Sequence, residues 1–206
     1  MAKQIVITGI GTDVGKTVVS AILCEAHKCS YWKPVQAGDL NYTDSNKISS
    51  WCSNEVTVLP EKHRLKTPAS PHLAAALDQV SIEHLNLEDH PNELFIEGAG
   101  GLMVPLNDSG LLYVDQFASW NLPLVLVSRH YLGSINHTLL SLEAIKSRGL
   151  QLAALIWVGD ENPGTEKIVE SIHPEIKTHR IPWGEEVNAE FIQREAKRIP
   201  WNLFKK

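Results

Sequence analysis

Residues Thr8–Thr17 read TGIGTDVGKT. The stretch follows an apolar run that is typical of a buried strand, and the residues after it, VVSAILCEAH, have the spacing of a helix. A glycine-rich turn between a strand and a helix is the setting of a phosphate-binding loop, in which backbone N–H groups and the positive end of the helix face an anion. In such a loop Lys16 would reach the terminal phosphates and the Thr17 hydroxyl would ligate Mg²⁺. The stretch therefore predicts a site for a nucleoside triphosphate.

The loop departs from the strict phosphate-binding pattern. Five residues separate Gly9 from Gly15, where the pattern has about four, and Ile10 occupies the usual glycine position. The alternative is a glycine-rich turn with an incidental GKT. The strand before it and the helix after it favour the phosphate-binding interpretation.

Short, nearly continuous apolar runs alternate with segments of helical spacing along the chain. This alternation predicts an α/β fold with a doubly wound, mainly parallel sheet, formed by residues 1–206 as a single domain. The expected strands are Gln4–Thr8, Ser30–Lys33, Leu94–Glu97, Pro123–Ser128, Leu152–Val158 and Thr178–Pro182, and the expected helices are Gly15–His27, Ser70–Gln79, Ser134–Ser147 and Thr165–Ser171.

Composition argues against several functional classes. The 206 residues carry a formal net charge of −5 without a basic cluster, which disfavours a nucleic-acid partner or a membrane surface. The three cysteines are an odd number and form no CxxC pair, so we expect reduced thiols rather than a disulfide framework. The chain also has no apolar stretch near 18 residues, and a cytoplasmic protein is expected.

A second informative stretch is YWKPVQAGD at Tyr31–Asp39. The proline after Lys33 holds it in extended backbone, and we expect this lysine at the carboxyl edge of the sheet, where open α/β sheets bind ligands. A plain surface lysine is an equally weighted alternative. Downstream, Asp44 is a candidate for either a helix N-cap or a metal ligand.

A third stretch, LFIEGAGG at Leu94–Gly101, has an apolar run that leads into Glu97 and three glycines. A buried carboxylate needs a partner, because an unpaired buried charge costs several kcal/mol. A Mg²⁺ ion on the phosphates would be such a partner, and the glycines would let a ligand approach the backbone.

Taken together, these stretches resemble the dethiobiotin synthetases. The resemblance also covers SPHLAA at Ser70–Ala75, LGSINHTLLS at Leu132–Ser141 and IPW at Ile181–Trp183, so it extends over most of the chain. The loop alone is shared with many ATPases. It is the order and spacing of all the stretches in one short chain that is specific.

The resemblance implies an ATP-dependent reaction that converts 7,8-diaminononanoate and CO₂ into dethiobiotin, ADP and phosphate. One amine captures CO₂ as a carbamate, the carbamate takes the γ-phosphate of ATP, and the second amine closes the ring and expels phosphate. Protein side chains would act by positioning and by stabilising charge. The implied cofactor is Mg²⁺, with ATP as co-substrate.

The resemblance also implies roles for individual residues. Lys16 and Lys33 would be catalytic, and Thr17, Asp44 and Glu97 would ligate Mg²⁺. The nucleotide would contact Gly11, Thr12, Asp13, Val14, Gly15, Lys16, Thr17, Val18, Gly159, Pro182 and Trp183. The substrate would contact Thr12, Lys33, Ala37, Gly100, Ser134, Ile135 and Asn136.

The last three substrate residues carry a further implication. Their backbone amides would open a helix and seat the substrate carboxylate. In the family this seat belongs to the opposite subunit, so a homodimer with the diamine across its interface is implied.

Two positions depart from the family pattern. Gly159 stands where the family often has an asparagine that reads adenine, which predicts weaker discrimination of ATP from other triphosphates. Ala37 stands where some members carry a hydroxyl residue beside the substrate. His72 and His137 could be bases, but each adjoins an expected helix start, and we interpret both as local hydrogen-bonding residues.

The competing function is a partitioning or switch ATPase that acts through a protein partner. Such relatives favour a second lysine early in the loop, where this chain has Gly11. A GTPase would need a base-reading motif that the sequence lacks, and a small-molecule kinase an arginine-rich lid. The fold alone does not distinguish these functions.

Overall fold

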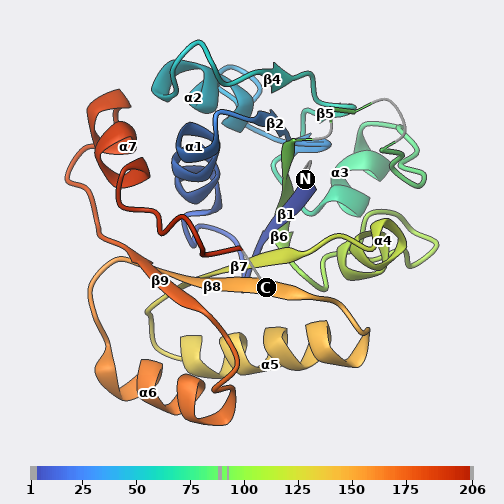
Figure 1. Ribbon diagram of the computed structural model, residues 1–206. Helices are drawn as coiled ribbons and strands as arrows, with labels where there is room; N and C mark the ends of the chain where they lie inside the picture. The colour runs from blue at the N-terminus through green and yellow to red at the C-terminus, as the bar shows by residue number, and fades with distance from the viewer. Residues whose placement is uncertain (1–3, 88–89, 92, 205–206) are drawn as a thin grey trace.

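The computed structural model describes residues 4–87, 90–91 and 93–204 and is built around a seven-stranded sheet (Figure 1). The strands lie in the order β4-β2-β6-β1-β7-β8-β9, and a second sheet pairs β3 with β5. The strands are β1 (Gln4–Gly9), β2 (Ser30–Trp32), β3 (Val35–Ala37), β4 (Val58–Leu59), β5 (His63–Leu65), β6 (Leu94–Gly101), β7 (Leu124–Arg129), β8 (Leu152–Val158) and β9 (Thr178–Ile181).

Strand β1 lies at the centre of the large sheet, with β6 on one side and β7 on the other. All the strand pairs of this sheet are parallel within the described residues. Because these strands are parallel, their carboxyl ends lie at one edge of the sheet. This is the edge at which open α/β sheets bind their ligands.

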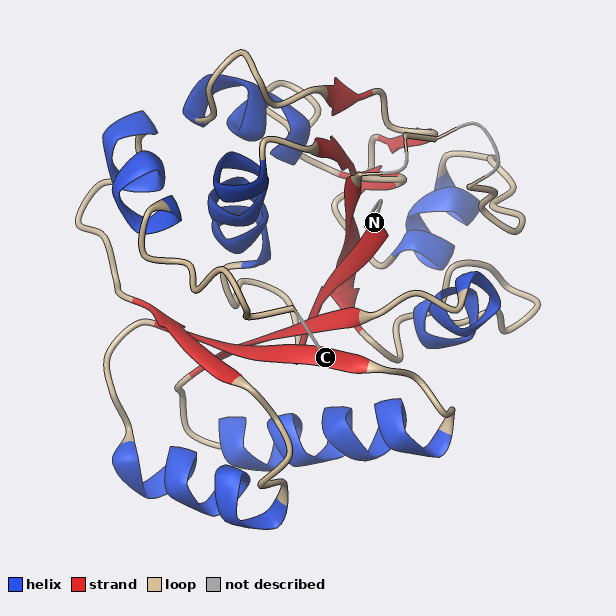
Figure 2. Cartoon of the chain, viewed as in Figure 1, coloured by secondary structure: helices blue, strands red, loops and turns tan. Residues whose placement is uncertain are grey.

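Helices cover both faces of the sheet (Figure 2). Helices α1, α2 and α7 lie on one face, and α3, α4, α5 and α6 lie on the other. The helices are α1 (Lys16–His27), α2 (Asp44–Trp51), α3 (Pro71–Leu77), α4 (Tyr113–Trp120), α5 (Ser134–Ser147), α6 (Pro163–Ile172) and α7 (Ala189–Ala196).

The hydrophobic core is accordingly divided into two clusters. Ile7 of β1 belongs to the cluster that includes Ile22 of α1 and Ile192 of α7. The adjacent Val6 belongs to the opposite cluster, with Phe117 of α4. Successive strand side chains point to opposite faces, so a strand covered on both sides is apolar throughout. This explains the continuous apolar runs.

The predicted doubly wound, mainly parallel α/β fold is confirmed. Every expected strand and helix is present: β8 and α5 have the expected bounds, and the ends of the others differ by at most four residues, the largest difference being at β6, which continues to Gly101. The elements that the sequence did not predict are β3, β4, β5, α2, α4 and α7. Among the described residues, none of the helices combines the length and apolarity that a membrane span requires.

Candidate active site

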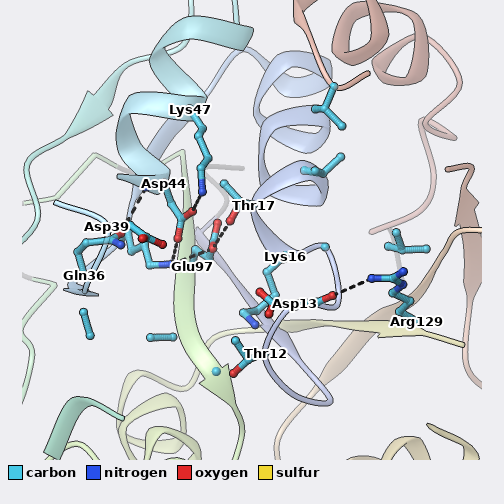
Figure 3. Close-up of a pocket in the computed structure, with 18 of the residues that line it drawn as sticks. Thr12, Asp13, Lys16, Thr17, Gln36, Asp39, Asp44, Lys47, Glu97 and Arg129 are labelled. Atoms are coloured by element: carbon cyan, nitrogen blue, oxygen red, sulfur yellow. Dashed lines mark hydrogen bonds and ion pairs between the residues drawn. The ribbon is translucent and has the colours of Figure 1, made fainter. Parts of the chain in front are cut away.

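A cavity of about 780 Å³ opens at the carboxyl edge of the sheet, between the loop after β1 and the neighbouring strand ends (Figure 3). Its size is in the range of small-molecule sites. Thirteen of the site residues expected from the sequence line it: Thr12, Asp13, Gly15, Lys16, Thr17, Val18, Lys33, Ala37, Asp44, Glu97, Gly100, Pro182 and Trp183.

The loop after β1 is held in shape by two glycines and a buried valine. A Cβ on Gly9 would lie 2.7 Å from Val14 Cγ2, which is too close for any other residue type. Gly15 has φ 95° and lies against Val158 at the end of β8. Val14 is buried, so its side chain anchors the loop to the core. These contacts fix the loop ahead of helix α1.

Lys16 folds back over this loop, and its Nζ donates to the Gly11 carbonyl at 2.7 Å. The side chain is buried, and burial is the main reason why the pKa of Lys16 falls to about 8. Glu97 acts in the opposite direction, because its negative charge favours the protonated amine. An arriving polyphosphate would stabilise the charged form in the same way.

Beside the loop, Lys33 lies between two carboxylates. Its Nζ donates to Glu97 Oε1 at 3.1 Å and also to Asp44 Oδ2. The Thr17 hydroxyl donates to the same Glu97 oxygen at 2.9 Å. Lys33, which we predicted to face the site, is therefore a buried part of it. The alternative of a plain surface lysine is wrong.

Lys33 and Asp44 each stabilise the ionised form of the other. Burial by itself would lower the pKa of Lys33, but the attraction of Glu97 and Asp44 outweighs it and raises that pKa well above the ordinary value. Burial would raise the pKa of Asp44, and Lys33 and Lys47 lower it instead. Lys33 and Asp44 are both charged at neutral pH.

Asp44 is the first residue of α2 and not its N-cap. The cap is Thr43, whose hydroxyl accepts from the Asn46 amide at 3.2 Å, while the Asn46 side chain accepts from the Thr43 amide at 3.0 Å. The capping interpretation of Asp44 is therefore wrong. Its carboxylate instead accepts a hydrogen bond from Lys33. It also accepts one from Lys47, which Figure 3 shows beside it.

The glycines after Glu97 serve the packing of the protein itself. Strand β6 does not end at Glu97 but continues to Gly101, which pairs with Gly9 of β1. A Cβ on Gly98 would lie 2.9 Å from the Phe117 ring, and Gly100 has φ 72°. Only Gly100 of these three lines the cavity. The strand can therefore approach the loop closely.

The far end of the cavity is apolar and aromatic. Arg129, at the end of β7, lies 4.4 Å from the centre of the half-exposed Trp183 ring and donates to the Asp13 carbonyl at 3.4 Å. Val158, Val187 and Phe191 complete this wall. Gly159 lies one residue beyond the wall and contributes no surface to it. A flat aromatic surface with a cation is suited to stacking against a nucleobase.

Several predicted residues lie outside the cavity. Gly11 belongs to the loop but not to the lining, and Val14 is buried behind it. Ser134, Ile135 and Asn136 begin α5, away from the cavity of this single chain. The Ser134 amide donates to the Tyr131 carbonyl at 2.9 Å, so this amide is already engaged. His72 and His137 hydrogen-bond locally, to Ser70 and Tyr131.

Sequence reasoning missed other residues of the cavity, above all Gln36, Lys47 and Arg129. Gln36 is buried, and its Oε1 accepts from the Asp44 amide at 3.4 Å. A signal existed for Lys47, which follows Asp44 by one helical turn, and for Arg129, which directly follows an apolar strand. Phe191 had no such signal, because α7 was not predicted.

The oxygen atoms present suit a small divalent cation. No group of three or more His, Cys, Asp or Glu side chains that could hold a metal occurs in the described part of the chain. Mg²⁺ does not need such a cage, because it is usually bound by one or two carboxylates together with waters and substrate phosphates. Thr17, Asp44 and Glu97 offer hard oxygen donors of this kind next to the loop.

Comparison with known proteins identifies the family. A family model described as an AAA domain matches residues 3–190. An ATP-dependent dethiobiotin synthetase of Christiangramia forsetii is 47% identical over 97% of this chain and 99% of its own length. A second, from Rhodopseudomonas palustris, is 49% identical over 88% of each chain. The chain belongs to the ATP-dependent dethiobiotin synthetase family.

Solved structures place this dethiobiotin synthetase family member among more distant ATPases of the same fold. The septum site-determining protein MinD of Pyrococcus horikoshii, in complex with Mg-ADP, gives a TM-score of 0.57 at 14% identity over 98% of this chain and 97% of that one. A ParA family ATPase of Chlorobium tepidum gives 0.56 at 14% identity over 98% and 94%. At these identities the likeness concerns the fold alone.

Proposed function

We propose that the chain converts diaminononanoate, CO₂ and ATP into dethiobiotin, ADP and phosphate. Family membership at 47% identity over nearly the whole chain supports this reaction. Within the site, the observation that carries the proposal is the buried, charged Lys33 beside the phosphate-binding loop. A fixed positive charge at this point suits both an anionic carbamate and a phosphoryl group in transfer.

The side chains act by position and charge. The loop amides and Lys16 bind the triphosphate, and the aromatic wall around Trp183 orients the base. Lys33 stabilises the carbamate oxygen as it attacks the γ-phosphate and displaces ADP. The second amine then attacks the carbamate carbon, its proton passes to the departing phosphate or to water, and phosphate is expelled. No side chain has to form a covalent bond in this reaction.

Thr17, Asp44 and Glu97 are the residues we propose for Mg²⁺. When bound, Mg²⁺ would neutralise charge on the phosphate oxygens that face these side chains. The Asp44 and Glu97 carboxylates already form ion pairs with Lys33, so the groups proposed for Mg²⁺ bind a cationic side chain of the protein itself.

The start of α5 supports a homodimer. Tyr131, Leu132 and Leu140 are exposed apolar side chains in and before this helix, and Leu132 is 103% exposed. Ser134, Ile135 and Asn136 lie between them. An exposed apolar surface next to the predicted carboxylate seat is suited to a second copy of the chain, which would bring that seat to the cavity of its partner.

The proposal is tested by phosphate release from MgATP, measured with and without diaminononanoate and bicarbonate. We expect release only when both are present, in equal amount to dethiobiotin. Turnover that ignores the diamine, or that responds to a protein partner instead, would favour a switch ATPase of the kind that shares this fold.

A further inference from the structure

The Glu97 carboxylate is fully buried and accepts four hydrogen bonds, two on each oxygen. Oε1 accepts from Thr17 and Lys33, which line the cavity. Oε2 accepts from the Tyr31 hydroxyl at 2.9 Å and from the Ser20 hydroxyl at 2.8 Å. Neither Tyr31 nor Ser20 lines the cavity. The two oxygens of one carboxylate therefore face different surroundings.

The partners of Oε2 come from rigid parts of the fold. Tyr31 lies on β2 and pairs with Phe95 of β6, two residues before Glu97. Ser20 lies on α1, one turn after Thr17. Both are completely buried. A carboxylate oxygen has about two lone-pair directions, and these two donors use both of them.

The Tyr31 and Ser20 hydroxyls both donate hydrogen bonds to the Glu97 carboxylate. A hydrogen bond to a charged acceptor is about twice as strong as one between neutral groups. The carboxylate is thus held in one orientation, with Oε1 on the cavity side, where an ion would take the place of the Thr17 or Lys33 hydrogen.

We propose that Tyr31 and Ser20 are positioning residues that restrict Glu97 to one-oxygen coordination and thereby favour Mg²⁺ over Ca²⁺. Ca²⁺ takes six to eight oxygen ligands and often binds both oxygens of a carboxylate, whereas Mg²⁺ requires a compact octahedral arrangement. A carboxylate that cannot turn its second oxygen towards the ion suits the smaller cation. This inference rests on the proposed role of Glu97 in holding Mg²⁺.

The test compares Tyr31→Phe and Ser20→Ala with the unaltered chain. Mn²⁺ is bound to the complex of the protein with ADP, with protein in excess, and its displacement by Mg²⁺ and by Ca²⁺ is followed by electron paramagnetic resonance. The ratio of the two displacing concentrations measures selectivity. We expect each substitution to shift this ratio towards Ca²⁺ by about tenfold. Loss of a residue that hydrogen-bonds to a metal ligand commonly changes metal affinity by at least that factor.

Tyr113→Phe is the matched control. Tyr113 is also a fully buried tyrosine, and its hydroxyl has no hydrogen-bond partner among the described residues. Removing that hydroxyl should leave the ratio unchanged. If Tyr31→Phe does not fold, as its melting curve would show, Ser20→Ala decides the question, because it removes only the second donor to the same oxygen.

Two outcomes overturn the inference: a ratio that does not change, or an equal loss of affinity for both ions, which is what a purely structural role would produce. Glu97→Gln separates this failure from failure of the proposed metal site. If Glu97→Gln retains Mn²⁺ affinity, Glu97 does not hold the ion and both proposals fall. If it loses that affinity while Tyr31→Phe keeps the wild-type ratio, only the positioning role is wrong.

Discussion

Lys16 and Lys33 are two buried lysines in one cavity with opposite electrostatic settings. Lys16 rests on a backbone carbonyl, and burial lowers its pKa to about 8. Lys33 rests on two carboxylates, which raise its pKa. The first is poised to gain a phosphate partner, whereas the second already has its charge fixed. We therefore propose that Lys16 acts in binding the nucleotide and that Lys33 stabilises charge during the reaction.

Lys33→Ala should therefore keep nucleotide affinity and lose most turnover, by about 100- to 1,000-fold, as when one stabilising donor is removed. Lys16→Ala should instead weaken nucleotide binding itself. Affinity for an ATP analogue and the rate of phosphate release check both variants. Unchanged turnover in Lys33→Ala would remove the role we give to Lys33. A melting curve with and without Mg²⁺ shows whether the Glu97 and Asp44 carboxylates, unpaired without Lys33, destabilise the fold.

Base selectivity is a second prediction at the scale of one residue. Gly159 has no side-chain amide, and the wall it adjoins is formed by Val158, Trp183 and Arg129. A wall that stacks on a base without bonding to its edge discriminates weakly, because a missing hydrogen bond corresponds to about 1 kcal/mol. We expect other triphosphates to support phosphate release within about tenfold of ATP. Equal and near-complete loss of activity with each of them would contradict this.

The main elements of the fold could be predicted, and the reason lies in their length and patterning. Strands such as β7 and β8 are covered on both faces and consist largely of a continuous apolar run, so they stand out in the sequence. Strand β4 has two residues and β3 three, too few for any pattern. Helix α2 reads DSNKISSW and has one buried apolar residue, Ile48, so its helical period is not visible.

The site was predictable to the extent that its residues lie in distinctive local stretches. Lys33 precedes a proline at a strand end, and Glu97 follows an apolar run, so both could be singled out from the sequence. Tyr31 and Ser20 could not, because a tyrosine in a strand and a serine in a helix are common in any sequence. Their role comes from the packing of α1 against β2 and β6. Contacts between distant elements are not visible in any local pattern.

At the element scale, Glu166 joins three elements at the edge of the sheet. Its Oε1 accepts from the Asn162 amide at 2.7 Å and from His130 at 2.8 Å, and its Oε2 accepts from Arg180. Burial alone would raise the pKa of Glu166, but these donors outweigh it and lower that pKa. The ionised carboxylate therefore stabilises the folded state, and this contribution is present above the ordinary pKa of 4.5.

Glu166→Gln should lower the free energy of unfolding by about 1–3 kcal/mol at neutral pH. The difference should be constant above pH 4.5 and shrink as the pH falls below that value through the lowered pKa. Urea unfolding at several pH values measures it. Glu161→Gln is the control, because Glu161 is an exposed residue in the loop just before α6. A difference that is the same at every pH would show that ionisation of Glu166 does not matter.

At the scale of the whole molecule, the expected dimer decides whether the site is complete. The cavity of one chain contains most of the residues proposed for the nucleotide and all three proposed for the metal, whereas Ser134, Ile135 and Asn136 lie elsewhere on the same chain. A site built by one chain alone would leave these residues without a role in the reaction.

Leu132→Asp should convert the dimer to a monomer and reduce turnover, because the side chain is fully exposed in the single chain and its replacement does not disturb the core. Sedimentation and phosphate release, each over a range of protein concentrations, test this. Ile172→Asp is the control, since Ile172 is an exposed apolar residue on α6. If the Leu132→Asp variant sediments with the same mass as the unaltered protein, α5 is not part of the interface.

The central claim is that the loop after β1 seats a triphosphate whose outer end faces Lys33 and the carboxylates of Asp44 and Glu97. The most direct test is a crystal structure with Mg²⁺ and a non-hydrolysable ATP analogue. The account predicts the γ-phosphate between Lys16 and Lys33, with the ion on Thr17, Asp44 and Glu97. A nucleotide bound elsewhere, or Lys33 turned away from the phosphates into solvent, would contradict it.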